Sequence, residues 1–345
     1  MPLSQIAIKD KIICQDNPVF IIAEAGVNHN GSLEMAKQLI ETAKEAGCDA
    51  VKFQSFTVKN LLSNAVSQDV FQMLASLELS IDAHHILSEY AEKTDIIFLS
   101  TPFDEEHADM LEEIDMPAFK IPSGELTNHP LLKHIAKKKK PVLLSCGMAN
   151  MEEISEAARI ILKENSQLIL LQCTTSYPCS PEDANLMVIP SLFHAFGLLV
   201  GYSDHTLGTT AAIVAITLGA RVIEKHFTLS TALPGPDHKA SVEPAQLKDL
   251  VQKIRETEQC LGKAQKFLTS PEITAHQQVR KGVTAKRDIA QGEVITPDII
   301  CMRRPAIGIL PAQIDLIIGR KARVDIVENE PIGWDKTVAC CDLVA

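Results

Sequence analysis

The feature that most constrains the fold is a series of short apolar segments, most of which end in a polar or charged residue. Segments that are apolar on both faces are typical of buried parallel strands. The gaps between them are long enough for one crossover helix each. Eight such segments predict an α/β chain with a (β/α)8 TIM barrel, and an open doubly wound sheet is the alternative. They span residues 19–23, 50–53, 96–99, 118–121, 142–144, 168–171, 198–200 and 222–223.

The gaps carry helical patterns, which supports the barrel. Ser32 is suited to cap the start of a helix, and Gly47 is suited to end it. Between them, the apolar residues of 33–43 recur at helical spacing. Two further helices are predicted within residues 151–162 and 207–218.

The chain changes character after Leu261, where residues 262–280 are polar and contain Pro271. Two later stretches, RDIAQGEVI at 287–295 and VDIVENEPI at 324–332, form a weak repeat that predicts two related hairpins in a small β domain. A domain of this size is marginal alone, so we expect it to pack on its own barrel or on a partner's. The predicted division is a barrel at 1–265, a linker at 266–282 and a β domain at 283–345.

Charge and cysteine content exclude several classes of protein. A net charge of −11 argues against nucleic-acid or anionic-membrane partners, because both need a basic face. The chain has no evident signal peptide, and no apolar run is long enough to span a membrane. Nine cysteines, an odd number without a CxxC pair, are typical of reduced thiols in a cytoplasmic protein.

Two histidines follow the last two predicted strands. His205 and His226 would lie on adjacent barrel strands, about 5 Å apart. Two imidazoles at that distance can share a divalent metal whose other positions are open to water or substrate. The alternative is that each histidine is hydrogen-bonded in the pocket without a metal.

Two lysines interrupt apolar strands. Burying Lys52 and Lys120 without partners is costly, so we expect them to create a positive field for phosphate or carboxylate at the barrel mouth. In one alternative they form ion pairs with Glu24 and Glu125. In another, a desolvated lysine attacks a carbonyl to form a Schiff base.

Other polar groups are expected near the same mouth. Residues 120–125 and 145–148 place serine beside glycine, which lets backbone N–H groups approach an anion. Glu24 and Glu125 are candidate acid–base groups. The turn at 234–238 would shape a loop over the barrel mouth, with His238 as a weaker candidate, and Arg303 and Arg304 lie in the small domain.

These residues occur in motifs that resemble those of the sialic acid (nonulosonate) synthase family, in the family's order and over nearly the whole chain. The resemblance implies a TIM barrel followed by an antifreeze-like (SAF) β domain. It also implies a domain-swapped homodimer, in which the small domain closes the partner's active site. The motifs are FIIAEAGVNHNG at 20–31, VKFQ at 51–54, STPF at 100–103, KIPSGE at 120–125, SDHT at 203–206, EKHFT at 224–228 and GPDH at 235–238.

The resemblance also implies roles for individual residues. His205 and His226 match the ligands of Mn²⁺ or Mg²⁺. Arg304 matches the arginine that reaches the sugar N-acyl group in the partner subunit. The phosphoenolpyruvate-binding positions match Lys52, Thr101, Lys120, Ser123, Ser145 and Ser203, and the positions around the acceptor sugar match Glu24, Gln54, Glu125, Tyr177 and Asp237. The residues expected to be catalytic are Glu24, Lys120 and Glu125.

The resemblance implies metal-dependent condensation of phosphoenolpyruvate with an N-acylmannosamine-type sugar. The product would be a nine-carbon 2-keto sugar acid, N-acetylneuraminate or N,N'-diacetyllegionaminate. The chain departs from the family pattern at Thr175, around Cys179 and at Ala306, near the expected sugar site. Alternatives are a pseudaminate synthase acting on a 2,4-diacetamido-trideoxy hexose, a Schiff-base aldolase, and a non-catalytic sugar-binding or ice-binding protein.

Overall fold

The computed structural model describes residues 5–339, which divide into two compact units with the boundary between Gly262 and Lys263. The first unit is built on an eight-stranded parallel sheet with the order β5-β4-β3-β10-β9-β8-β7-β6. The two end strands, β5 and β6, also contact each other, which makes the sheet a barrel and not an open sheet. The strands are β3 (Phe20–Gly26), β4 (Ala50–Ser55), β5 (Ile97–Pro102), β6 (Phe119–Ile121), β7 (Val142–Ser145), β8 (Leu168–Cys173), β9 (Leu199–Asp204) and β10 (Val222–His226). All eight predicted strands are therefore confirmed.

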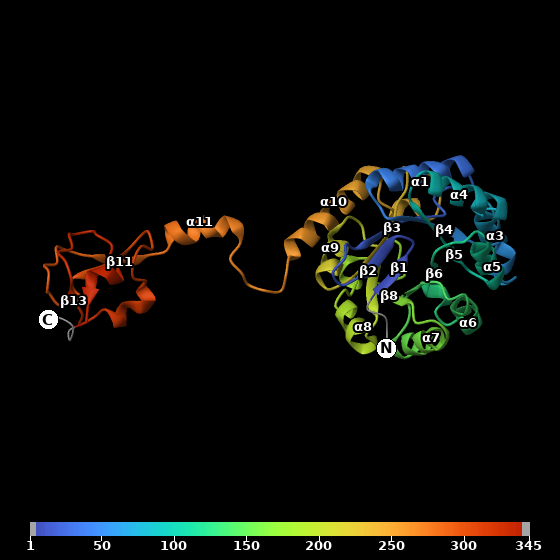
Figure 1. The fold of residues 1–345 in the computed structure, drawn as a ribbon. Coiled ribbons are helices and arrows are strands. Elements are labelled where there is room, and N and C mark those ends of the chain that lie inside the picture. Colours follow the sequence, from blue (N-terminus) through green and yellow to red (C-terminus); the bar gives the residue numbers. More distant parts are fainter. Residues whose placement is uncertain (1–4, 340–345) are drawn as a thin grey trace. The chain divides into compact units, whose positions relative to one another are not determined.

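Helices surround the strands in chain order (Figure 1). They are α1 (Leu33–Ala46), α4 (Ile81–Lys93), α5 (Glu105–Glu113), α6 (His129–Lys137), α7 (Met151–Glu164), α8 (Val188–Phe196), α9 (Thr210–Thr217) and α10 (Pro244–Leu261). Two short helices that were not predicted, α2 (Val58–Leu61) and α3 (Gln68–Ala75), follow β4. Within residues 5–339, no helix is both long and apolar enough to cross a lipid bilayer.

The predicted helix ends are found in α1. The Ser32 side chain accepts a hydrogen bond from the backbone N–H of Met35, and Gly47 ends the helix with φ at 86°. The predicted apolar face, which includes Leu39 and Ile40, is buried. The predicted helix at 207–218 begins later, at Thr210, because residues 207–209 form the loop after β9.

A two-stranded hairpin that was not predicted precedes the barrel. Its strands β1 (Gln5–Ile8) and β2 (Lys11–Cys14) pair antiparallel. Ile6, Ile8 and Ile13 belong to the apolar core of the barrel. The hairpin thus buries apolar side chains of its own on the barrel.

The second unit contains the predicted repeat. The two repeat segments pair with each other, because Ile289 and Ile326 exchange backbone hydrogen bonds of 2.8 and 2.9 Å. Asp288 accepts from the backbone N–H of Glu328, and Asp325 accepts from that of Gln291, both at 2.7 Å. The repeat is therefore structural, but its segments pair with each other and do not form two separate hairpins. The elements of this unit are α11 (Ser270–Val279), β11 (Gly282–Ala285), β12 (Ile300–Arg303), β13 (Lys321–Ala322), β14 (Thr337–Val338) and the 3-10 turns Pro311–Leu316 and Trp334–Lys336.

Glycine at position 201 is required by close packing between strands. A Cβ atom there would lie 2.6 Å from the carbonyl oxygen of Val222 and 2.6 Å from Cδ2 of Leu171. We expect Gly201→Ala to lower the free energy of unfolding by about 1–3 kcal/mol, because the barrel must shift to accept the methyl group. Urea denaturation followed by circular dichroism measures this. Gly124→Ala is the control, since a Cβ at Gly124 meets nothing within 4 Å. Equal stability of the two variants would contradict the packing argument.

Candidate active site

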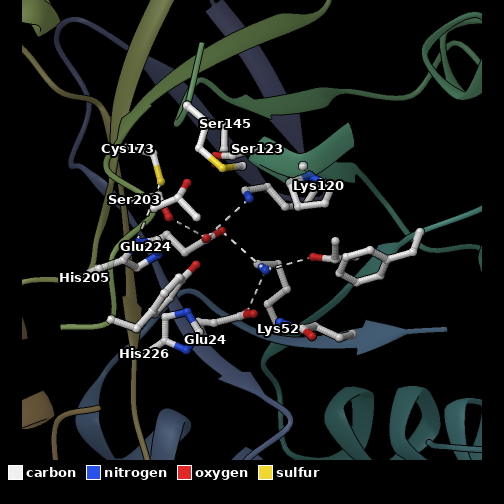
Figure 2. A pocket seen from close by; sticks show the side chains of 18 residues that line it. Glu24, Lys52, Lys120, Ser123, Ser145, Cys173, Ser203, His205, Glu224 and His226 are labelled. Carbon is white, nitrogen blue, oxygen red and sulfur yellow. Dashed lines mark hydrogen bonds and ion pairs between the residues drawn. The ribbon is translucent and has the colours of Figure 1, made fainter. Parts of the chain in front are cut away.

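A pocket opens at the carboxyl ends of the barrel strands, where β/α barrels carry their active sites. The structure brings most of the predicted site residues together around it (Figure 2). The predicted residues that line it are Glu24, Lys52, Gln54, Thr101, Lys120, Ser123, Ser145, Tyr177, Ser203, His205 and His226.

Three predicted residues do not line this pocket. The Glu125 carboxylate accepts a hydrogen bond from Asn128 at 2.7 Å. The Asp237 carboxylate lies 3.8 Å from Nδ1 of His226. Arg304 is exposed in the second unit.

A cluster of four buried charged groups lies at the centre of the pocket. The Lys52 Nζ lies 2.7 Å from Oε2 of Glu24 and 3.6 Å from Oε2 of Glu224. The Lys120 Nζ lies 3.4 Å from Oε1 of Glu224. All four side chains are at most 4% exposed, so water screens these charges little. The cluster is drawn in Figure 2.

The expected alternative in which both lysines form ion pairs is half right. Lys52 does pair with Glu24, but the ionic partner of Lys120 is Glu224 and not Glu125. Glu224 was not predicted to be a central residue. Its signal was present, because Glu224 follows Val222 and Ile223 as a charge within an apolar strand, as the two lysines do in theirs.

The two carboxylates of the cluster titrate differently. Burial raises the pKa of Glu24 to about 7, although Lys52 opposes the shift. Burial also acts on Glu224, but the ammonium groups of Lys120 and Lys52 outweigh it and lower its pKa to about 2. The pKa of Lys120 is lowered by burial despite the nearby Glu224. Glu224 is therefore ionised at neutral pH, and its negative charge stabilises the two buried ammonium groups when no anion is bound.

A buried serine provides a second sign that the pocket binds an anion. The hydroxyl of Ser145 is buried at the end of β7 and has no hydrogen-bond partner. A buried polar group without a partner costs about 1–3 kcal/mol. An anionic oxygen beside Lys120 would remove that cost. The neighbouring Ser123 already has a partner, since its hydroxyl accepts from the backbone N–H of Gly147 at 3.0 Å.

The two imidazoles predicted to bind a metal lie together on the other side of the pocket. The ring centroids of His205 and His226 are 5.3 Å apart. The Nδ1 atom of His205 lies 2.7 Å from the carbonyl oxygen of Thr174, so it carries the proton and leaves the lone pair on Nε2. The Nδ1 atom of His226 is buried without a hydrogen-bond partner. Burial lowers the pKa of both histidines, which favours the neutral form that binds metals.

These two histidines fit a metal site that the protein completes only in part. In the described part of the chain, no group of three or more His, Cys, Asp or Glu side chains is arranged to hold a metal. The other ligands would have to be water or substrate oxygens, as expected for an open catalytic site. The ring of Tyr177 packs on His205, with centroids 4.0 Å apart, and so borders the same space.

The loop predicted to cover the barrel mouth is held by a buried histidine. Nδ1 of His238 lies 2.7 Å from the hydroxyl of Thr228, and its Nε2 lies 3.2 Å from Oδ1 of Asn30. His238 therefore has a structural role in positioning this loop. Burial raises the pKa of Asp237, the residue before it, to about 6.

The charge cluster leads to a prediction about ligand-induced stability. Glu224→Gln removes one negative charge from two buried lysines, and breaking a buried pair costs about 3 kcal/mol. We expect the variant to unfold at lower temperature than wild type. Phosphoenolpyruvate, the anion that the sequence resemblance implies, should raise the unfolding temperature of the variant more than that of wild type. Thermal unfolding with and without the ligand measures both effects. Glu224→Asp keeps the charge and is the control. An equal ligand shift in Glu224→Gln and wild type would contradict competition between Glu224 and the ligand.

Comparisons with known proteins show the family to which the chain belongs. The sequence pattern of the NeuB family matches residues 39–266, and that of the SAF domain matches residues 280–337. The N,N'-diacetyllegionaminic acid synthase of Campylobacter jejuni is 46% identical, over 90% of this chain and 98% of the relative. The human N-acetylneuraminate-9-phosphate synthase is 35% identical, over 96% of each chain.

A solved structure extends the likeness to the fold. The N-acetylneuraminic acid (sialic acid) synthetase of Leptospira borgpetersenii, in complex with citrate, superposes with a TM-score of 0.76 and 35% identity. That match covers 80% of this chain and 95% of the other. The matched patterns cover most of the barrel and the small β domain, and the two relatives are similar over nearly their whole length. The chain therefore belongs to the NeuB family of enzymes.

Proposed function

We propose that the protein condenses phosphoenolpyruvate with an N-acylmannosamine-type sugar and water, giving a nine-carbon 2-keto sugar acid and inorganic phosphate. The observation that carries this proposal is one pocket with two chemically different ends. Two buried lysines and the unpartnered Ser145 hydroxyl form an anion-binding end. Two neutral imidazoles form the other end, where a carbonyl group could be activated.

The anion-binding end suits phosphoenolpyruvate. Lys52 and Lys120 would bind its phosphate and carboxylate, with hydroxyl groups from Thr101 and three serines as further donors. Fixed charges of this kind stabilise a reaction in which charge moves, because they need no reorganisation. The three serines are Ser123, Ser145 and Ser203, which all line the pocket.

The other end suits the sugar. A divalent metal bound by His205 and His226, Mn²⁺ or Mg²⁺, would supply Lewis-acid polarisation of the sugar carbonyl. Glu24 and Gln54 line the pocket within reach of a bound sugar, and Tyr177 borders it. We propose that these groups, together with Asp237 and Glu125, orient the sugar hydroxyls.

The proposed reaction forms one C–C bond and breaks one C–O bond. C3 of phosphoenolpyruvate attacks the carbonyl carbon of the open-chain sugar and forms the new C–C bond, while the carbonyl oxygen takes up a proton. C2, left electron-deficient, accepts the oxygen of a water molecule, whose two protons balance the one taken up by the sugar oxygen and the one carried by the departing phosphate. The bond between C2 and the phosphate oxygen then breaks, which leaves the 2-keto group and inorganic phosphate. Lys120 stays close to the charge that develops, so it acts in the chemical step as well as in binding.

For the acceptor, we favour the legionaminate and neuraminate type over the pseudaminate type. The chain is 46% identical to the legionaminic acid synthase of Campylobacter jejuni and 36% identical to the pseudaminic acid synthase of the same species, which supports this choice. The stretch PGPDHKAS at 234–241 also resembles the sialic and legionaminic branch.

The reaction is tested with phosphoenolpyruvate and a panel of N-acetylmannosamine, its 6-phosphate and 2,4-diacetamido-2,4,6-trideoxyhexoses. We expect phosphate release that depends on both substrates, with a product whose mass equals sugar plus pyruvate. Release of phosphate without the sugar, or no reaction with any sugar, would contradict the proposal. Trapping of pyruvate on a lysine by borohydride would instead favour a Schiff-base aldolase.

Metal dependence is tested separately. We expect EDTA to abolish turnover and Mn²⁺ to restore it. His205→Ala and His226→Ala should each abolish turnover while the fold survives. Removal of His226 should not cost a hydrogen bond at Nδ1, because this atom has no hydrogen-bond partner. Circular dichroism checks the fold. Full activity in chelator would exclude the metal.

We further propose that the protein is a homodimer with shared active sites. None of the residues of α11 is buried, and Phe267, Leu268, Ile273 and Val279 in and beside this helix are exposed. A helix without buried residues gains little from packing, so a second chain is a reasonable source of cover.

The seven described cysteines are free thiols, which supports a cytoplasmic location.

Mixing two inactive variants tests the shared site. Arg304→Ala and His226→Ala are each expected to be weak or inactive as homodimers. If Arg304 acts in the partner's site, the mixed dimer has one site with both defects and one with neither. About half of the wild-type activity should then return per co-refolded heterodimer. If heterodimers form and no activity returns, the small domain serves its own barrel.

A further inference from the structure

A fully buried ion pair between β9 and β10 lies on the face of these strands that points away from the pocket. The Lys225 Nζ is 2.8 Å from Oδ2 of Asp204, and both side chains are 0% exposed. The two residues face each other in the register of β9 and β10. Neither lines the pocket, whereas Glu224 and His226 do, because successive side chains on a strand point to opposite faces.

The ion pair is hydrogen-bonded to the chain on both sides of His205. Asp204 and Thr206 flank this residue, and Oδ1 of Asp204 accepts from both the N–H and the hydroxyl of Thr206 at 2.8 Å. The Lys225 ammonium also donates to the carbonyl oxygen of Thr206. One side chain, adjacent to His226 in sequence, thus holds both neighbours of His205.

The rest of the surroundings completes this restraint. The carbonyl oxygen of His205 accepts from the N–H of Cys179 at 2.8 Å, and its ring is oriented by Thr174. Lys225 links these contacts to the strand that carries His226. The relative position of the two imidazoles is therefore set by the pairing of β9 and β10 and by this buried salt bridge, which holds the backbone on both sides of His205.

Stability alone does not explain such a pair. Transferring two charges from water into a protein interior costs several kcal/mol per ion, and an apolar pair of similar size is often as stable or more stable. Unlike an apolar pair, however, a charged pair fixes the relative position of its two side chains through its hydrogen bonds.

We propose that Asp204 and Lys225 are positioning residues that set the geometry of His205 and His226 for a divalent metal. This inference rests on the metal role assigned to these histidines in the proposed function. Residues that orient metal ligands typically contribute 10–100-fold to metal affinity.

The test measures Mn²⁺ binding without substrates, by electron paramagnetic resonance of the free ion. The main variant is Asp204→Leu combined with Lys225→Met, which replaces the pair by apolar side chains and leaves no unpaired charge. We expect it to remain folded and to bind Mn²⁺ at least tenfold more weakly than wild type. Asp204→Asn keeps the acceptor for Thr206 and should show a smaller loss.

A pair remote from the pocket is the control. Arg255 lies 3.1 Å from Asp49, and neither residue lines the pocket. Arg255→Met should leave the Mn²⁺ affinity unchanged. Wild-type affinity in the folded double variant would overturn the inference, and if that variant does not fold, wild-type affinity in Asp204→Asn would do so.

Failure of the metal role is distinguishable from failure of the synthase proposal. If wild type does not bind Mn²⁺, the positioning inference is overturned. Phosphate release from phosphoenolpyruvate, which is measured independently, would still decide whether the protein is a synthase.

Discussion

The active site depends on how two ammonium groups are kept charged inside a barrel. Lys52 and Lys120 are almost fully buried, and such burial is tolerated only with partners. Without a ligand, Glu24 and Glu224 are those partners. The N–O distances of 3.4 and 3.6 Å from the lysines to Glu224 are longer than ordinary hydrogen bonds. An anionic ligand at hydrogen-bonding distance would therefore pair with the lysines more strongly than Glu224 does.

The barrel makes this arrangement possible through strand alternation. On β10, Glu224 and His226 point into the pocket while Lys225 points away. The same strand thus contributes a counter-charge for the lysines, an imidazole, and the salt bridge that restrains the other histidine. A shift of one residue in register would exchange these roles.

Sequence patterns predicted most of the barrel and of the pocket, because both depend on local signals. Apolar segments and helix caps such as Ser32 and Gly47 act over a few residues. The partner of Lys120 could not be predicted in this way, because Glu224 and Glu125 are equally plausible until the strand order is known. The repeat at Ile289 and Ile326 was visible, but its mutual pairing is a non-local contact. The amino-terminal hairpin gave no distinctive signal.

Calorimetric titration with phosphoenolpyruvate alone shows whether the buried lysines form the anion site. We expect one binding event per chain that Lys120→Met weakens at least tenfold, or about 1.4 kcal/mol. Binding should depend only weakly on salt, because buried charges are poorly screened. Lys253→Met, which alters an exposed ion pair with Asp249, should bind as wild type does. Equal affinity of Lys120→Met and wild type would show that the buried lysines do not form the anion site.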